Sequence, residues 1–205
     1  MDYTRLASDE QIQETVAGLA ERNVQATVVA SGADALATIK EWIPAGASVM
    51  NGSSQTLQEI GYIDYLKAGQ HGWRNLHAEV LAEPDEAKQV LLRKQAVLSD
   101  YYLGSVHGLS KTGEFVIASN TGSQLPHIVF TSQYLIFVVG IQKIVPTLAA
   151  AIERLEQYVV GREDESMRKQ YGMGTILSKM LIFRHENPSG GRNVRMILVR
   201  EVLGF

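Results

Sequence analysis

Residues 134–139 read YLIFVV, and this stretch is the strongest indication of the fold class. Successive side chains of a strand point to opposite faces of a sheet, so a run that is apolar throughout is buried on both faces. Burial on both faces is typical of parallel sheets, which are covered on each side by other layers. The stretch therefore predicts a buried parallel strand at the centre of the protein.

Strand and helix patterns alternate on both sides of this stretch. After it, residues 147–158 place Leu148, Ala151 and Leu155 on one helical face. Before it, Ser8 and Gln11 fit a capping box at the start of a helix. The expected elements are a helix over 8–22, a strand over 25–30, a helix over 31–43 and a strand over 48–50. This alternation predicts an α/β fold with a mainly parallel sheet and flanking helices.

The remaining segments are assigned from turn signals and periodicity. We expect a hairpin whose strands are joined through Ser110–Gly113, because a glycine there suits a turn that needs positive φ. The other expectations are a broken region over 61–72, a long helix over 77–98 with an internal start at Pro84, a loop over 161–174, and a final pair of strands over 181–185 and 194–202 that turns at Gly190–Gly191.

Composition limits the classes of function. The 205 residues are expected to form one domain, and with 45% hydrophobic and 20% charged residues they have the composition of an ordinary globular protein. A net charge of -3 argues against nucleic acid as a partner. No apolar run reaches the roughly 20 residues of a spanning helix, and the N-terminus lacks the pattern of a signal peptide. We therefore expect a cytoplasmic protein without a membrane partner.

The chain contains no cysteine. Disulfides, thiolate zinc sites, cysteine nucleophiles and cysteine-held iron–sulfur clusters are thereby excluded within this chain. No metal site is predicted either, because His71 and His77 flank Trp73 at a spacing that does not place both on one helix face.

Three loops follow predicted strands and carry groups suited to an anion. They are residues 51–56 (NGSSQT), 119–122 (SNTG) and 140–143 (GIQK). Ligands of open α/β sheets bind outside the carboxyl ends of the strands, where glycines allow close backbone approach and hydroxyls, amides and a lysine supply hydrogen bonds. The same residue types dominate ordinary turns and helix caps, and Thr56–Glu59 fits a capping box, so each loop alone also has a structural explanation.

His107 is the histidine of greatest interest, because it lies in GSVHGL beside Gly104 and Ser105. A structural role is the favoured interpretation, since spacing identifies no carboxylate partner, and a catalytic role is the alternative.

A resemblance to a known family rests on residues 100–145. A strand that ends near Gly104–Ser105, the T-G-E hairpin at 112–114, the N-T-G turn at 120–122 and VVGIQKIVP at 138–146 carry it. The segment 43–61, IPAGASVMNGSSQTLQEIG, and the C-terminal ILVREVLGF match as well. Together these segments resemble the LUD domain, the lactate-utilisation family, over about residues 35–205. The helix and strand of residues 1–34 lie outside this match.

The resemblance implies a fold like that of the ribose-phosphate isomerase, glucosamine-phosphate deaminase and CoA-transferase group. It also implies a role in L-lactate oxidation beside iron–sulfur partner proteins. Many short members of the family carry cysteines near the equivalent of residues 171–179. Because this chain has none, a redox centre must belong to a partner, or the chain has lost that role.

Neither CoA transfer nor sugar-phosphate isomerisation, two reactions of that fold group, has a clear set of catalytic residues in this chain. A CoA-transferase needs a nucleophilic glutamate at a strand end, where this chain has Asn120. A carboxylate base for sugar-phosphate isomerisation has only Glu114 and Asp64 as candidates.

Two functions are therefore expected. In the first, the chain acts in lactate oxidation and binds a small organic acid or an anionic cofactor; in the second, it is a non-catalytic binding or assembly module. The predicted ligand-binding residues are Gly52, Ser53, Ser54, Thr56, Gly104, Ser105, Asn120, Thr121, Gly122 and Lys143.

Overall fold

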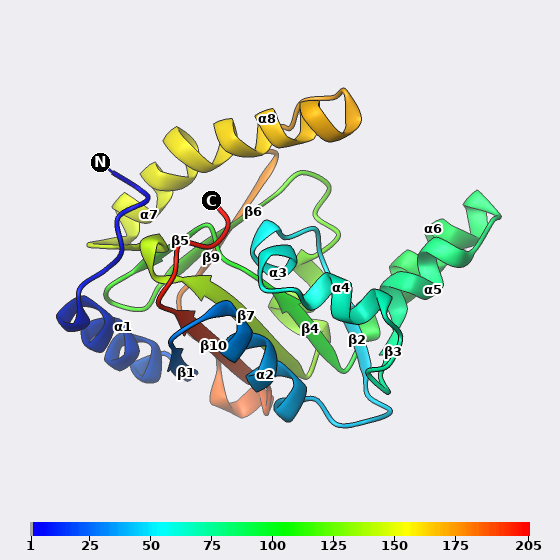
Figure 1. The fold of residues 1–205 in the computed structure, drawn as a ribbon, viewed down its shortest axis with the longest axis horizontal. Coiled ribbons are helices and arrows are strands. Elements are labelled where there is room, and N and C mark those ends of the chain that lie inside the picture. The colour runs from blue at the N-terminus through cyan, green and yellow to red at the C-terminus, as the bar shows by residue number, and fades with distance from the viewer. Residues whose placement is uncertain (1) are drawn as a thin grey trace.

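A sheet of six parallel strands forms the centre of the protein (Figure 1). The computed structural model describes residues 2–205, except for the side chains of residues 170 and 171. The spatial order is β1 (Val24–Val29), β10 (Asn193–Val199), β7 (Tyr134–Gly140), β4 (Tyr101–Gly104), β2 (Ser48–Asn51) and β3 (Arg74–Asn75).

The central strand β7 is the one that YLIFVV predicts. It pairs in parallel with β10 on one side and β4 on the other. Leu135 and Phe137 belong to the apolar cluster on one face of the sheet, and Ile136 and Val138 to the cluster on the opposite face. The prediction of a parallel strand buried on both faces is confirmed.

A second, smaller sheet packs on one face of the first. It contains β8 (Ile144–Val145), β5 (Gly108–Ser110), β6 (Phe115–Ser119) and β9 (Lys179–Phe183), in that order. The predicted hairpin is present, because β5 and β6 pair antiparallel through a turn in which Gly113 has a φ of 92°. Phe115 and Ile117 of β6 face the central sheet, whereas Val116 faces the helices outside.

The predicted final strand pair is wrong. β9 pairs antiparallel with β6 in the smaller sheet, and β10 inserts between β1 and β7 in the central sheet. The reason is burial: β10 is apolar on both faces, like β7, and is stabilised by two neighbours in a covered sheet. Gly190 and Gly191 end a short 3-10 turn, not a hairpin.

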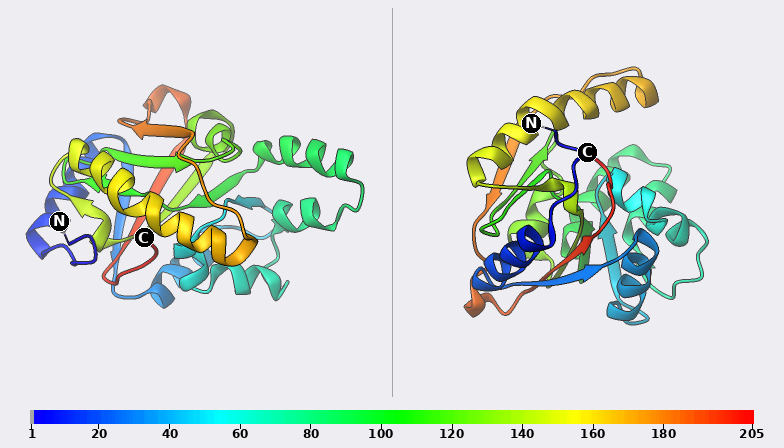
Figure 2. Two further views of the ribbon diagram at one scale, coloured as in Figure 1. Left: turned by 90° about the horizontal axis from the view of Figure 1, so that it is seen from above. Right: turned by 60° about the vertical axis from the view of Figure 1, so that its left-hand side comes forward.

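Helices cover the outer layers (Figure 2). α1 (Asp9–Glu21) packs with the smaller sheet on one face of the central sheet, and its predicted capping box between Ser8 and Gln11 is formed. The opposite face is covered by α2 (Gly32–Trp42), α3 (Gln55–Glu59) and α4 (Tyr62–Lys67). The helix α4 lies in the region that the sequence predicts to be broken.

Two helical segments extend from this body. The predicted long helix is interrupted at Pro84, as expected, and forms an arm of α5 (Leu76–Ala82) and α6 (Glu86–Gln95) that projects to the right in Figure 1. α7 (Leu148–Arg154) continues through a π-helical stretch into α8 (Val160–Tyr171), which crosses the top of the molecule. The predicted loop over 161–174 is therefore mostly helix, supported by the Asp164–Arg168 pair one turn apart.

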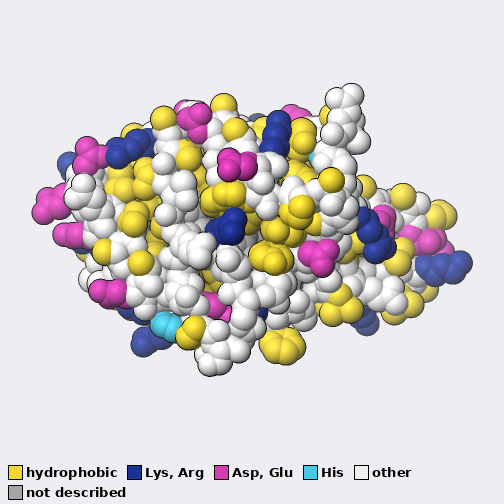
Figure 3. Space-filling model, turned by 90° about the horizontal axis from the view of Figure 1, so that it is seen from below, with side chains coloured by type: hydrophobic (Ala, Val, Ile, Leu, Met, Phe, Trp, Pro, Cys, Tyr) yellow, Lys and Arg dark blue, Asp and Glu magenta, His cyan; other side chains and the backbone are white. Residues whose placement is uncertain are grey.

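Surface charge is mixed on the face shown in Figure 3, where acidic and basic side chains alternate with hydrophobic ones. Among the helices of residues 2–205, none combines the length and apolarity that a bilayer crossing requires.

Candidate functional site

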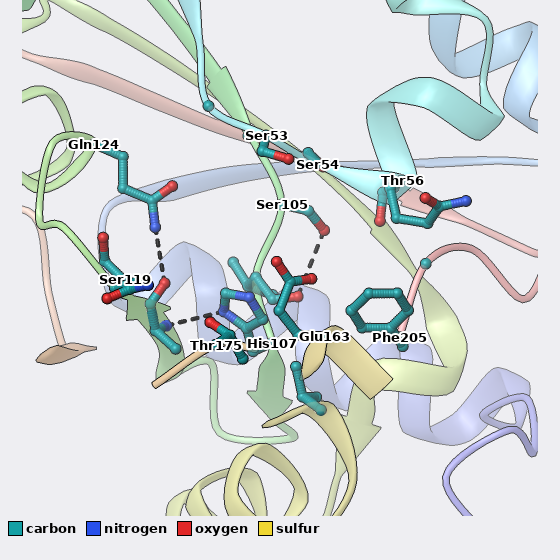
Figure 4. Close-up of a pocket in the computed structure, with 18 of the residues that line it drawn as sticks. Ser53, Ser54, Thr56, Ser105, His107, Ser119, Gln124, Glu163, Thr175 and Phe205 are labelled. Atoms are coloured by element: carbon teal, nitrogen blue, oxygen red, sulfur yellow. Dashed lines mark hydrogen bonds between the residues drawn. The ribbon is translucent and has the colours of Figure 1, made fainter. Parts of the chain in front are cut away.

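A cavity of about 520 Å³ opens where the carboxyl ends of β2 and β4 meet the smaller sheet and α8 (Figure 4). Loops of the central sheet supply one side, the loop after β6 supplies another, and α8 with the segment that follows it closes the third. The lining includes Gly52, Ser53, Ser54, Thr56, Tyr102, Gly104, Ser105, His107, Asn120, Thr121, Gln124, Lys143, Glu163, Thr175 and Phe205.

The loop after β2 enters this cavity because its first residue has no side chain. A Cβ at Gly52 would lie 2.8 Å from the Tyr102 hydroxyl oxygen and 2.9 Å from Oε1 of Gln124. A real Cβ at this position would therefore force the ends of the Tyr102 and Gln124 side chains to move, so glycine allows the close approach. Ser54 then caps α3 by accepting a hydrogen bond from the Leu57 backbone N–H at 3.3 Å. The predicted capping box at Thr56–Glu59 is wrong, because the helix begins earlier and Thr56 lies inside it.

Lys143 is a buried ammonium with only hydroxyl partners. The residue is 2% exposed, and its Nζ donates to Thr56 Oγ1 at 3.0 Å and to Ser105 Oγ at 3.1 Å. Burial, assisted by the positive charge of Arg154, lowers the pKa of Lys143 to about 7, and the charge of Glu59 acts in the opposite direction. Within the described part of the chain, Lys143 forms no ion pair with a carboxylate.

Arg154 adds a second buried cation next to the cavity. Its side chain is fully buried, donates to the His107 carbonyl through Nη1, and lies against the rings of Tyr3 and Tyr158. Its Nε and Nη2 have no hydrogen-bond partner among the residues described. Like Lys143, Arg154 forms no ion pair with a carboxylate among the described residues.

His107 is held neutral beside these cations. Its Nδ1 accepts the Ala118 backbone N–H at 3.0 Å, which leaves the ring proton on Nε2. Burial, together with the charges of Lys143 and Arg154, lowers the pKa of His107 to about 3. The ring is half-buried and lines the cavity, so its Nε2–H is a neutral donor group in the lining.

Glu163 is the acidic side chain that α8 brings to the cavity. In Figure 4 its carboxylate points into the cavity, toward the loop that carries Ser105. The side chain is half-buried, and burial raises its pKa. Glu163 is not among the predicted site residues, because a loop is predicted over this segment; the spacing of Asp164 and Arg168 is the signal that indicates a helix.

Most residues predicted as ligand-binding come together in this cavity. Gly122 does not line it: its φ is 85° and its N–H is capped by Ser119 Oγ, so it shapes the turn. The predicted residues that line the cavity are Gly52, Ser53, Ser54, Thr56, Gly104, Ser105, Asn120, Thr121 and Lys143, and His107 joins them.

The two candidate carboxylate bases lie elsewhere. Glu114 pairs with Arg22 at 2.5 Å, and Asp64 is a mostly exposed residue on α4. Neither lines the cavity. Within the described part of the chain, no group of three His, Asp or Glu side chains is arranged to hold a metal ion.

The sequence profile of the family described as LUD domain matches residues 12–204. The chain belongs to the LUD domain family. The match includes most of the N-terminal segment that the resemblance leaves out, so α1 and β1 are part of the family's fold. Membership supports a role related to lactate utilisation.

A solved structure supports the fold of this LUD protein. The LUD protein is similar to the crystal structure of a DUF162 family protein from Deinococcus radiodurans, with a TM-score of 0.55. The two share 14% sequence identity, and the comparison covers 95% of this chain and 99% of the other. At this identity the likeness concerns the fold. A search of curated proteins finds no significant match.

Proposed function

We propose that this LUD protein binds a small organic acid, or the anionic part of a cofactor, in the cavity and acts in lactate utilisation with redox partner proteins. The observation that carries the proposal is the buried Nζ of Lys143, which hydrogen-bonds only to hydroxyl groups.

Two buried cations lack a compensating negative charge. A buried charge is costly unless an opposite charge and hydrogen bonds accompany it. Lys143 and Arg154 are both buried, and neither is paired with an acid in the described residues. A carboxylate that enters the cavity would supply the missing charge, and the hydroxyls of Ser53, Ser54 and Ser105 and the Nε2 proton of His107 supply further hydrogen bonds.

A redox partner follows from the chemistry of lactate oxidation. Conversion of lactate to pyruvate releases two electrons and two protons, which an acceptor must take up. This chain has no cysteine and cannot hold a cysteine-ligated iron–sulfur cluster itself. We therefore propose that an iron–sulfur partner protein receives the electrons.

The binding step is tested by isothermal titration calorimetry with L-lactate, pyruvate and phosphate. Lys143→Met should weaken binding roughly ten- to one-hundred-fold, the usual cost of a lost charged hydrogen bond. Lys67→Met is the matched control, because the Lys67 side chain is 74% exposed on α4, far from the lining. Equal affinity of the Lys143→Met protein would contradict the proposal.

Proton uptake provides a second measurement on the same samples. Lys143 has a pKa of about 7, so it is half protonated at neutral pH, and a bound anion should raise this pKa. Binding at pH 7 should then take up roughly half a proton, measured from the heats in buffers of different ionisation enthalpy. The Lys143→Met protein should show no such uptake.

The alternative is a non-catalytic binding or assembly module, since the carboxylate bases expected for this fold group lie outside the cavity. The purified protein, combined with its redox partners, should oxidise L-lactate if the first proposal holds. Anion binding without lactate-dependent electron transfer would favour the alternative.

A further inference from the structure

We infer that the cavity takes an amphipathic carboxylate whose aliphatic body is longer than that of lactate. The inference rests on the proposed function for the carboxylate end of the ligand. It adds that the rest of the ligand is aliphatic, which follows from the remaining residues that line the cavity.

The size of the cavity is the first observation. A volume of about 520 Å³ lies within the range of roughly 300–1,000 Å³ that is typical of pockets for drug-sized ligands. A three-carbon hydroxy acid at Lys143 would leave most of this volume filled with water. A ligand that fills it must extend well beyond the polar end.

The second observation is the apolar part of the cavity lining. Leu155 and Val159 belong to the apolar cluster under α7 and α8, and both also line the cavity. Met167 of α8 and Ile176 of the following segment add flexible and branched aliphatic surface. Ile176 lines the cavity although it is 70% exposed, so it presents a large apolar side chain that a ligand would cover.

Phe205 bridges the polar and apolar sides. It lines the cavity, and the preceding Gly204 lies so close to Lys143 that a Cβ there would be 3.2 Å from Nζ. Figure 4 shows the Phe205 ring beside Thr56, one of the hydrogen-bond partners of Lys143. A carboxylate held by Lys143 would therefore continue past an aromatic ring onto the aliphatic wall.

The test is a series of unbranched carboxylates from propanoate to octanoate, titrated against the protein. Each buried methylene contributes about 0.8 kcal/mol, so Kd should fall roughly three- to fourfold per methylene until the cavity is filled. A Kd that is independent of chain length would overturn the inference.

Two variants test whether the apolar lining residues cause the dependence of Kd on chain length. Ile176→Ser should flatten the dependence of Kd on chain length. Leu98→Ser is the control, because Leu98 is 73% exposed and lies outside the cavity, and it should leave the whole series unchanged. If short and long carboxylates bind equally and depend on Lys143, this inference fails while the proposed function stands. If no carboxylate of any length binds, both fail.

Discussion

Replacement of Lys143 by methionine should make the protein more stable while it removes anion binding. Methionine keeps the length of the side chain but carries no charge, so the buried cavity wall stays filled. The ordinary pKa of a lysine is 10.5, and in the folded protein burial lowers that of Lys143 to about 7. This difference corresponds to about 5 kcal/mol that the ammonium costs the folded state when it is fully charged.

The sign of the pH dependence follows from the same values. Between pH 7 and 10.5 the unfolded chain keeps the proton that the native protein has released, so wild-type stability rises with pH across this window. At pH 7 the cost is about 4 kcal/mol, against which the variant loses two hydrogen bonds to Thr56 and Ser105 worth about 1 kcal/mol each. Lys143→Met should therefore be about 2 kcal/mol more stable at pH 7, and the gain should vanish at about pH 9.

Urea denaturation followed by circular dichroism at pH 7, 8 and 9.5 measures this difference. Lys67→Met again serves as the control, and because its side chain is exposed, it should change the unfolding free energy by less than about 0.5 kcal/mol at each pH. A Lys143→Met protein that is less stable than wild type at pH 7, or a difference that does not change with pH, would refute the reasoning. Lys143 would then not be a buried, uncompensated cation.

Two further substitutions test the fold. Gly113→Ala should lower the unfolding free energy by at least about 2 kcal/mol more than Gly46→Ala in urea titrations. Both glycines have positive φ, but only a Cβ at position 113 would clash with the backbone of Gly18. Equal losses of unfolding free energy in the two variants would contradict this. His127 is buried, and its pKa is lowered from the 6.5 of an ordinary histidine to about 4. As pH drops from 6.5 to 4, the unfolding free energy of the wild type should therefore fall by up to about 3 kcal/mol more than that of His127→Gln. The control variant His185→Gln should follow the wild type.

Local patterns were sufficient for much of the fold. YLIFVV predicted β7, because an apolar run can be buried on both faces only inside a covered sheet. The capping box of Ser8 and Gln11 predicted the start of α1, and the glycine at 113 predicted the hairpin turn. Each of these signals acts between residues that are close in sequence.

The site residues were also predicted in type, because glycine, hydroxyl and lysine side chains followed strands. Their convergence required the order of the strands. β9 and β10 were assigned to one hairpin, although they belong to different sheets, because strand pairing depends on which apolar faces find cover in space. The helix α8 was missed because its sequence is mostly charged and polar and contains too few apolar residues to indicate a buried helical face.

Sequence alone was thus enough for the parallel α/β architecture and for the residue types that line the cavity, because both depend on the character of short segments. The environment of Lys143, in contrast, could not be predicted from the sequence. Its hydroxyl partners Thr56 and Ser105 are 87 and 38 residues away in the chain, and only the packing of β2, β4 and β7 side by side brings them to its Nζ. Burial and missing counter-charge, which make this lysine a candidate ligand-binding group, are properties of the folded chain.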